Sequence, residues 1–188
     1  ALVGDSSAWT LGGGLVSWGL DHGPYESPFD PDEIVLLNLA RKGYRLAPGA
    51  TIDLDVPRPR PDVDLEDEAW WRDTIATVEP DLVVALFGLS DLQSREINGD
   101  VIEFGSPEFE ELMSSAVTDL FGDLAETAPV IVLTTPPLIG EHMPQPVMAE
   151  FFRNESAQRA TPLNAIFAST AAADDGIAVV DFAALLCP

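Results

Sequence analysis

The chain of 188 residues has a mass of 20.2 kDa, which suits one domain with a substantial core. Its hydrophobic content of 46% and mean hydropathy of +0.13 indicate a folded protein and exclude an acidic disordered chain. The formal charge of −23, from 32 acidic and 9 basic residues, excludes nucleic-acid binding and opposes contact with anionic membrane surfaces. We therefore expect a single domain over residues 1–188.

The first half of the chain predicts two buried strands that are separated by a helix and a loop. Short apolar runs indicate the strands, and a stretch rich in Gly, Pro, Ser and Asp indicates the loop. The predicted elements are a strand over residues 2–4, a helix over about 7–20, a loop over 21–32, a strand over 33–39 and a proline-rich, acidic surface segment over 53–68.

The second half alternates helices with buried strands. The strongest helix start is at Ser106, a typical N-cap that is followed by Pro107 and by acidic residues. The predicted elements are a helix over 70–78, a strand over 81–87, a turn or hairpin over 98–100, a helix from 107 to about 127, a strand over 129–135, a helix from 154 or 156 to about 173 and a strand over 176–181. This alternation predicts an α/β fold in which helices cover both faces of a parallel sheet, a three-layer α/β/α sandwich.

Metal and membrane signals are absent from the sequence. His22 and His142 are isolated and Cys187 is the only cysteine, so we expect no structural metal and no cofactor. Cys187 is either a free thiol or the partner of a cysteine beyond this sequence. No apolar run approaches the ~20 residues that cross a bilayer, and the first residues do not resemble a signal peptide. Because the chain starts inside a strand and ends without a closing element, we expect both ends to be cut from a longer protein.

Polar or glycine-rich residues follow three predicted strands, at Gly4-Asp5-Ser6, at 88–91 and at 134–136. The carboxyl ends of parallel strands meet at one edge of a sheet, where ligand sites form. Ser6 at such an edge suits a nucleophile attacking an ester carbonyl, because the free N–H groups of a helix start would meet the oxyanion. The alternative for Asp5 and Ser6 is a helix N-cap without chemistry.

These strand ends resemble the sequence blocks of the SGNH hydrolases, also called GDSL-like esterases. Residues 98–108 and 180–188 also resemble segments of particular SGNH domains. These are the domains fused to the bacterial membrane acyltransferases that modify cell-surface glycans. The resemblance implies a flavodoxin-like parallel sheet and a nucleophilic Ser6. It implies an oxyanion hole made by the Ser6 N–H, the Gly43 N–H and the Ser90 side chain, with Gly49 as a competitor of Gly43. It leaves Asp91 as a substrate-side group or a helix cap.

The resemblance implies a serine-dependent acyl-ester hydrolase or O-acyltransferase that acts on O-acetyl groups of cell-envelope glycans. Such a protein would work outside the cytoplasm, tethered through a fused membrane acyltransferase domain that this chain lacks. Two departures stand out: Ser90 replaces the usual Asn, and no Asp-x-x-His occurs, so we expect this chain to lack its general base and to turn over little.

Two alternatives come from other classes of protein. The first is a non-catalytic module on the same fold, which would bind a glycan or an acyl donor, and the serine at position 90 favours it. The second is a flavodoxin-like phosphate or nucleotide binder at the turn after the first strand. The acidic charge and Asp5, which would repel a phosphate, count against this second alternative.

Overall fold

The computed structural model describes residues 1–5, 7–15, 35–41, 44–51, 64–136 and 156–186. The main sheet has four parallel strands in the order β1-β3-β6-β7. Their bounds are β1 (Leu2–Gly4), β3 (Val83–Leu86), β6 (Val130–Leu133) and β7 (Ile177–Val180). Within the described residues, no helix has the length and apolar character that a membrane crossing requires.

A further extended segment lies beside β1 on the side away from β3. Asn38 forms a parallel bridge with Leu2, and Leu2 donates to the Leu37 carbonyl while Leu39 donates to the Leu2 carbonyl, both at 2.8 Å. The predicted strand over residues 33–39 is therefore reduced to one bridged residue among those described. When this segment is counted as the second strand in chain order, the sheet has the strand order 2-1-3-4-5, which is that of flavodoxin-like sheets.

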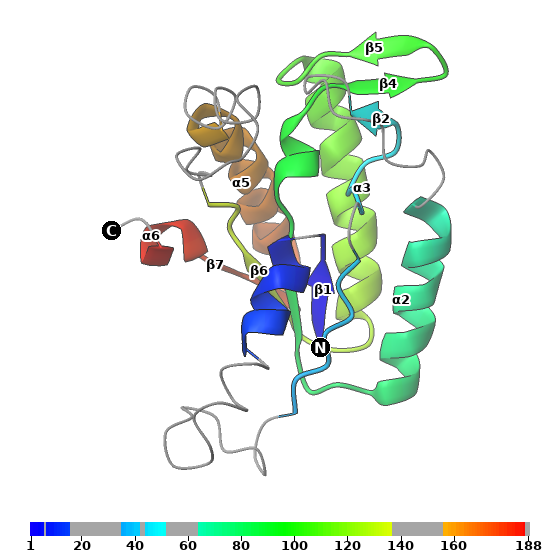
Figure 1. Ribbon diagram of the computed structural model, residues 1–188, viewed down its shortest axis with the longest axis vertical. Coiled ribbons are helices and arrows are strands. Elements are labelled where there is room, and N and C mark those ends of the chain that lie inside the picture. The colour runs from blue at the N-terminus through cyan, green and yellow to red at the C-terminus, as the bar shows by residue number, and fades with distance from the viewer. Residues whose placement is uncertain (6, 16–34, 42–43, 52–63, 137–155, 187–188) are drawn as a thin grey trace.

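Helices cover both faces of this sheet (Figure 1). Because side chains alternate between the two faces along each strand, each face packs against its own set of helices. On one face, Val3, Val83, Ala85 and Val132 belong to a core cluster completed by residues of three helices. These helices are α2 (Asp64–Val78), α3 (Pro107–Ala125) and α5 (Ser156–Ala173). On the other face, Leu2 and Leu86 pack with Ala8 and Phe182, from the helix over residues 7–15 and from α6 (Phe182–Leu186). The three-layer α/β/α sandwich is thus confirmed.

A small antiparallel sheet is attached to the carboxyl end of β3. Its strands β2 (Ala50–Thr51), β4 (Arg95–Ile97) and β5 (Asp100–Ile102) pair in the order β2-β4-β5. The short 3₁₀ helix η1 (Leu89–Leu92) connects β3 to β4. Asn98 and Gly99 have φ angles of 55° and 90°, as a tight type I′ hairpin requires, which confirms the turn predicted there.

Helix boundaries agree with the sequence where a cap is present. The Ser106 hydroxyl accepts the Phe109 N–H at 3.1 Å, so the predicted N-cap of α3 is confirmed. In contrast, α2 begins at Asp64 and not at Trp70, so residues 64–68, which were expected to lie on a surface segment, form the start of the helix. Acidic residues favour a helix start, because they complement the helix dipole. The short α6 also forms where no closing element was expected.

The two adjacent tryptophans of α2, Trp70 and Trp71, differ in burial. Trp71 is fully buried and its indole N–H donates to the Leu39 carbonyl at 2.7 Å. Trp70 is 37% exposed, and the guanidinium of Arg41 lies 4.0 Å from its ring centroid.

Candidate active site

The carboxyl ends of the four parallel strands are joined side by side by hydrogen bonds. The Gly88 N–H after β3 donates to the Asp5 carboxylate after β1 at 3.0 Å. The Thr135 hydroxyl after β6 donates to the Phe87 carbonyl at 2.8 Å, and Thr134 bonds Asp181 after β7 at 3.2 Å. The expectation that the polar strand ends share one edge is therefore confirmed. Ligands of such sheets bind where the connections diverge, which here is between β1 and β3.

Asp5 occupies the helix N-cap position at this edge. One carboxylate oxygen accepts the Ser7 N–H at 2.7 Å, and the Asp5 carbonyl accepts the Trp9 N–H at 3.0 Å. These bonds start the helix over residues 7–15 directly after β1, so the capping role predicted for Asp5 or Ser6 belongs to Asp5. Ser6 itself lies outside the described residues.

Two glycines allow the strand ends to approach this closely. Gly4 has a φ of +137°, and a Cβ on it would lie 1.9 Å from the Leu86 carbonyl oxygen. A Cβ on Gly88 would lie 2.4 Å from the Ser7 hydroxyl and 3.2 Å from the Asp5 carboxylate. A larger residue at position 4 would push the β1 turn away from the end of β3, whereas one at position 88 would require the Ser7 hydroxyl to move.

A second arm of the site follows the extended segment beside β1. Arg41 donates its N–H to the Gly4 carbonyl at 2.8 Å, and Tyr44 donates to the Arg41 carbonyl at 3.2 Å. The Tyr44 ring is buried and lies 5.8 Å from the ring of Phe87. Arg41 and Tyr44 are thereby held at the ends of β1 and β3, whereas Lys42 and Gly43 lie outside the described residues. Its competitor Gly49 packs against Glu96 and Ile97 in the small sheet.

A third arm is η1, which carries Ser90 and Asp91. Ser90 is partly buried, and its carbonyl accepts a bond from the Arg95 guanidinium at 2.6 Å. Asp91 is fully buried, and one of its oxygens accepts the Leu46 N–H at 2.8 Å and an Arg95 nitrogen at 3.0 Å. The side chain of Asp91 therefore faces protein groups in this structure, and Asp91 is not the cap of η1, whose N-cap is Gly88.

The carboxyl groups of Asp5 and Asp91 both have a pKa above the usual range. Burial raises the pKa of Asp5, while hydrogen bonds from Ser7 and Gly88 oppose the shift. Burial raises the pKa of Asp91 to about 7; the Arg95 charge opposes this shift and the charge of Asp5 adds to it. The two acidic groups are thus close enough to influence each other, and the arginine beside them limits the cost of ionising Asp91.

Arg95, the partner of Asp91, is a buried residue beside this edge that the sequence analysis did not single out. Arg95 is fully buried within β4, where an arginine is rare unless it is paired. The available signal was the spacing of four residues between Asp91 and Arg95, which is also common on exposed helices and so did not point to burial.

The part of the chain that the structure describes holds no group of three His, Cys, Asp or Glu side chains arranged to bind a metal. His22, His142 and Cys187 lie outside that part.

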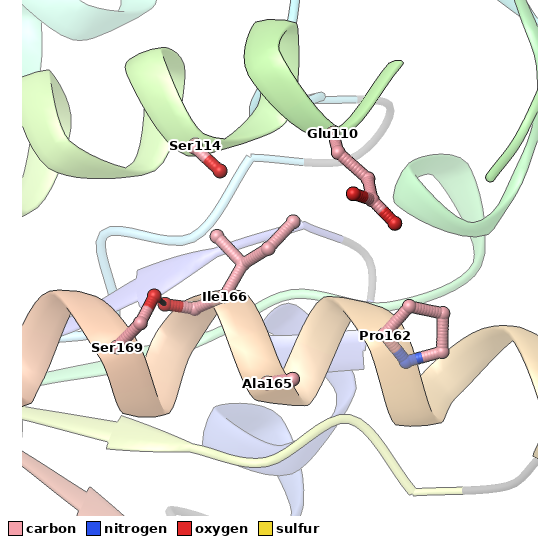
Figure 2. Close-up of a pocket in the computed structure, with 6 residues that line it drawn as sticks. All are labelled: Glu110, Ser114, Pro162, Ala165, Ile166 and Ser169. Carbon is pink, nitrogen blue, oxygen red and sulfur yellow. Dashed lines mark hydrogen bonds between the residues drawn. The ribbon is translucent and has the colours of Figure 1, made fainter. Parts of the chain in front are cut away.

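A surface groove of about 240 Å³ lies elsewhere, between α3 and α5. Figure 2 shows Glu110 and Ser114 of α3 above Pro162, Ile166 and Ser169 of α5. All its described lining residues come from these two helices, and the strand ends do not contribute to it. The groove is therefore separate from the candidate active site.

Solved structures of enzymes share this fold. One is LAE5, an alpha/beta hydrolase enzyme from the metagenome of Lake Arreo, Spain, with a TM-score of 0.52 at 16% identity, over 98% of this chain and 78% of that one. Another is a gut microbial diltiazem-metabolizing enzyme, with a TM-score of 0.52 at 14% identity, over 98% of this chain. The present chain spans only 36% of that enzyme's length. No family model and no curated protein matches the sequence. At these identities the likeness shows the fold, which hydrolase enzymes use.

Proposed function

We propose that this chain is the serine-bearing part of an acyl-ester hydrolase or O-acyltransferase, with Ser6 as the nucleophile. The observation that carries the proposal is the turn after β1. Asp5 fills the N-cap role, and its carboxylate accepts the N–H groups of Ser7 and Gly88, so a helix start is held at the ends of β1 and β3. N–H groups at a helix start favour negative charge, which an attacking serine generates on its substrate.

The proposed reaction is acyl transfer in two steps. The Ser6 hydroxyl attacks the ester carbonyl carbon while a histidine takes its proton, and the resulting oxyanion accepts hydrogen bonds from the Ser6 N–H, the Gly43 N–H and the Ser90 hydroxyl. The C–O bond to the alcohol then breaks, and the alcohol leaves with the proton from the histidine. Water or a sugar hydroxyl attacks the acyl-serine in the second step, which releases the product and restores Ser6.

The finer parts of the proposal are supported by the motif resemblance alone. They are an O-acetyl substrate on a cell-envelope glycan, a site outside the cytoplasm, a fused membrane acyltransferase domain as partner, and a histidine from an Asp-x-x-His segment that this sequence does not contain. Ser90 supports a weaker oxyanion hole than the amide of the usual Asn would, because its hydroxyl has a shorter reach.

The test compares p-nitrophenyl acetate hydrolysis by this chain and by a longer natural chain that contains it, with Ser6→Ala and Ser7→Ala variants of the longer one. Ser7 is the matched control, because it lies on the same turn but packs against Gly88. We expect the longer chain to turn over, Ser6→Ala to abolish turnover and Ser7→Ala to retain most of it. A fluorophosphonate probe, located by peptide mass spectrometry, should label Ser6.

Inactivity of the longer chain, with no labelling of Ser6, would contradict the proposal. If that inactive chain still binds an acetylated glycan, the non-catalytic binding module becomes the better explanation. Full loss of activity in Ser7→Ala, with Ser6→Ala still active, would move the nucleophile by one residue.

A further inference from the structure

We propose that the buried Arg95–Asp91 ion pair is the positioning unit of the oxyanion hole. In this proposal the pair holds the turn that carries Ser90 and the segment that follows Gly43 in one fixed relation. The inference rests on the proposed function, and it adds a role for two residues that would not contact the substrate.

Asp91 connects the two arms directly. It follows Ser90 in η1, and its carboxylate accepts the N–H of Leu46, three residues after Gly43, at 2.8 Å. Both Asp91 and Leu46 are buried, with exposed fractions of 0% and 2%. A hydrogen bond to a charged acceptor in such surroundings is stronger than one in water and fixes the distance between the two segments.

Arg95 fixes the backbone of η1 through several hydrogen bonds. Its guanidinium donates to the carbonyl of Ser90 at 2.6 Å, to the carbonyl of Gln93 at 3.3 Å and to the carboxylate of Asp91 at 3.0 Å. These three acceptors lie along η1 and the residue after it, so one planar fork sets the path of the backbone at Ser90. A lysine has a single ammonium group and cannot reproduce this fork.

The same two arms are attached to the β1 turn at their other ends. Arg41 bonds the Gly4 carbonyl, and Gly88 bonds the Asp5 carboxylate. The Leu46–Asp91 bond therefore completes a series of contacts that joins Gly4 to Arg41, Leu46 to Asp91 and Gly88 to Asp5. Without Arg95, the Asp91 carboxylate would lose the guanidinium that bonds the same oxygen as Leu46.

The second oxygen of Asp91 gives an independent indication of a role beyond packing. It is buried and has no hydrogen-bond partner among the described residues. Burying such an atom is costly, and a neutral apolar pair would avoid that cost. The protein retains a charged pair here, which is expected where geometry at a reaction site outweighs stability.

The test measures kcat and KM for p-nitrophenyl acetate in the longer natural chain, with Arg95→Met, Arg95→Lys, Asp91→Asn and Arg159→Met variants. Arg159 is the matched control, because its guanidinium also donates to a carbonyl of η1, that of Leu92, at 3.0 Å. Inhibition by a boronic acid, which forms a tetrahedral adduct with a nucleophilic serine, reports the oxyanion hole separately. Thermal unfolding identifies variants that do not fold.

We expect Arg95→Met to lower kcat by about 10²–10³-fold, the effect of losing one oxyanion donor, with KM changed less than about threefold. Boronate affinity should fall in parallel. Arg95→Lys should recover part of kcat. Asp91→Asn keeps an acceptor for Leu46, so it should fold and lower kcat by roughly tenfold, as one weakened charged hydrogen bond implies. Arg159→Met should stay within about threefold of the native kcat.

Four results would overturn the inference. Folded Arg95→Met or Asp91→Asn could keep native kcat and boronate affinity, or could change KM alone. Arg159→Met could lower kcat as much as Arg95→Met, which would indicate general destabilisation of η1. If Arg95→Met does not fold, Asp91→Asn and Arg95→Lys decide the question. If the native protein shows no turnover dependent on Ser6, the proposed function fails and this inference fails with it.

Discussion

Replacing Gly4 by alanine should destabilise the protein strongly, because both the backbone and the space at this position require glycine. The φ of +137° lies in a region that residues with a Cβ avoid, at a cost of about 1–3 kcal/mol. The new Cβ would also lie 1.9 Å from the Leu86 carbonyl oxygen and 2.8 Å from the Ala8 Cβ. The Leu86 carbonyl belongs to the backbone of β3, so this clash is removed only if β1 and β3 separate. Such a separation adds about 1–3 kcal/mol, as overpacking of a core does.

The expected loss is therefore about 2–6 kcal/mol, a large share of the ~5–15 kcal/mol that stabilises a typical domain. At about 2–4 °C per kcal/mol for a chain of this size, Tm should fall by at least about 4 °C. The measurement is urea and thermal unfolding followed by circular dichroism. Gly13→Ala is the matched control: Gly13 is helical and exposed with nothing within 4 Å of its added Cβ, so that variant should gain roughly 0.5–1 kcal/mol. If Gly4→Ala unfolds within about 1 kcal/mol of the native protein, the reasoning is refuted.

Three further predictions concern stability. Ser106→Ala removes the acceptor of the Phe109 N–H and should cost about 1 kcal/mol in urea unfolding, and an unchanged midpoint would contradict the capping role. Arg72→Ala breaks an ion pair with Asp123 whose side chains are 57% and 40% exposed, so the free energy of unfolding should change by less than about 1 kcal/mol, and a larger loss would show that the pair is not solvated. The raised pKa of Asp91, about 7 when folded, means that the folded state binds more protons than the unfolded state above the usual value of 3.8. Its contribution to stability is therefore lost as pH rises from about 4 through 7, and Asp91→Asn should flatten that pH dependence of the unfolding free energy; equal slopes would refute the assignment.

The layers of the fold could be predicted because their signals are local. Continuous apolar runs at Val83–Leu86 and Val130–Leu133 require a strand covered on both faces, and helical segments between them require parallel pairing. The polar ends of these strands then had to meet at one edge. The helix cap at Ser106 and the turn at Asn98-Gly99 could also be predicted, since a cap and a type I′ turn depend mainly on the residues that form them.

Other features depend on contacts that are distant in sequence. The acidic residues 64–68 resemble a surface segment, yet they belong to a helix that Trp71 and Ile75 anchor in the core. The burial of Arg95 depends on Asp91, Ser90 and Gln93 arriving together, and no periodicity indicates this. The role of Asp5 as both a cap and a bridge to Gly88 also required the pairing of β1 with β3.

The length of the β4–β5 hairpin in the small antiparallel sheet is independent of the strand register of the main sheet. This hairpin lies within the connection from β3 to α3, whereas the register of the main sheet is fixed by pairing among β1, β3, β6 and β7. The hairpin tip at Gly99 is exposed, with nothing within 4 Å of an added Cβ. Insertions or deletions there would change the small sheet while leaving the pairing of the main sheet and the β1 turn intact. The length of this hairpin can therefore vary without disturbing the turn on which the proposed chemistry would depend.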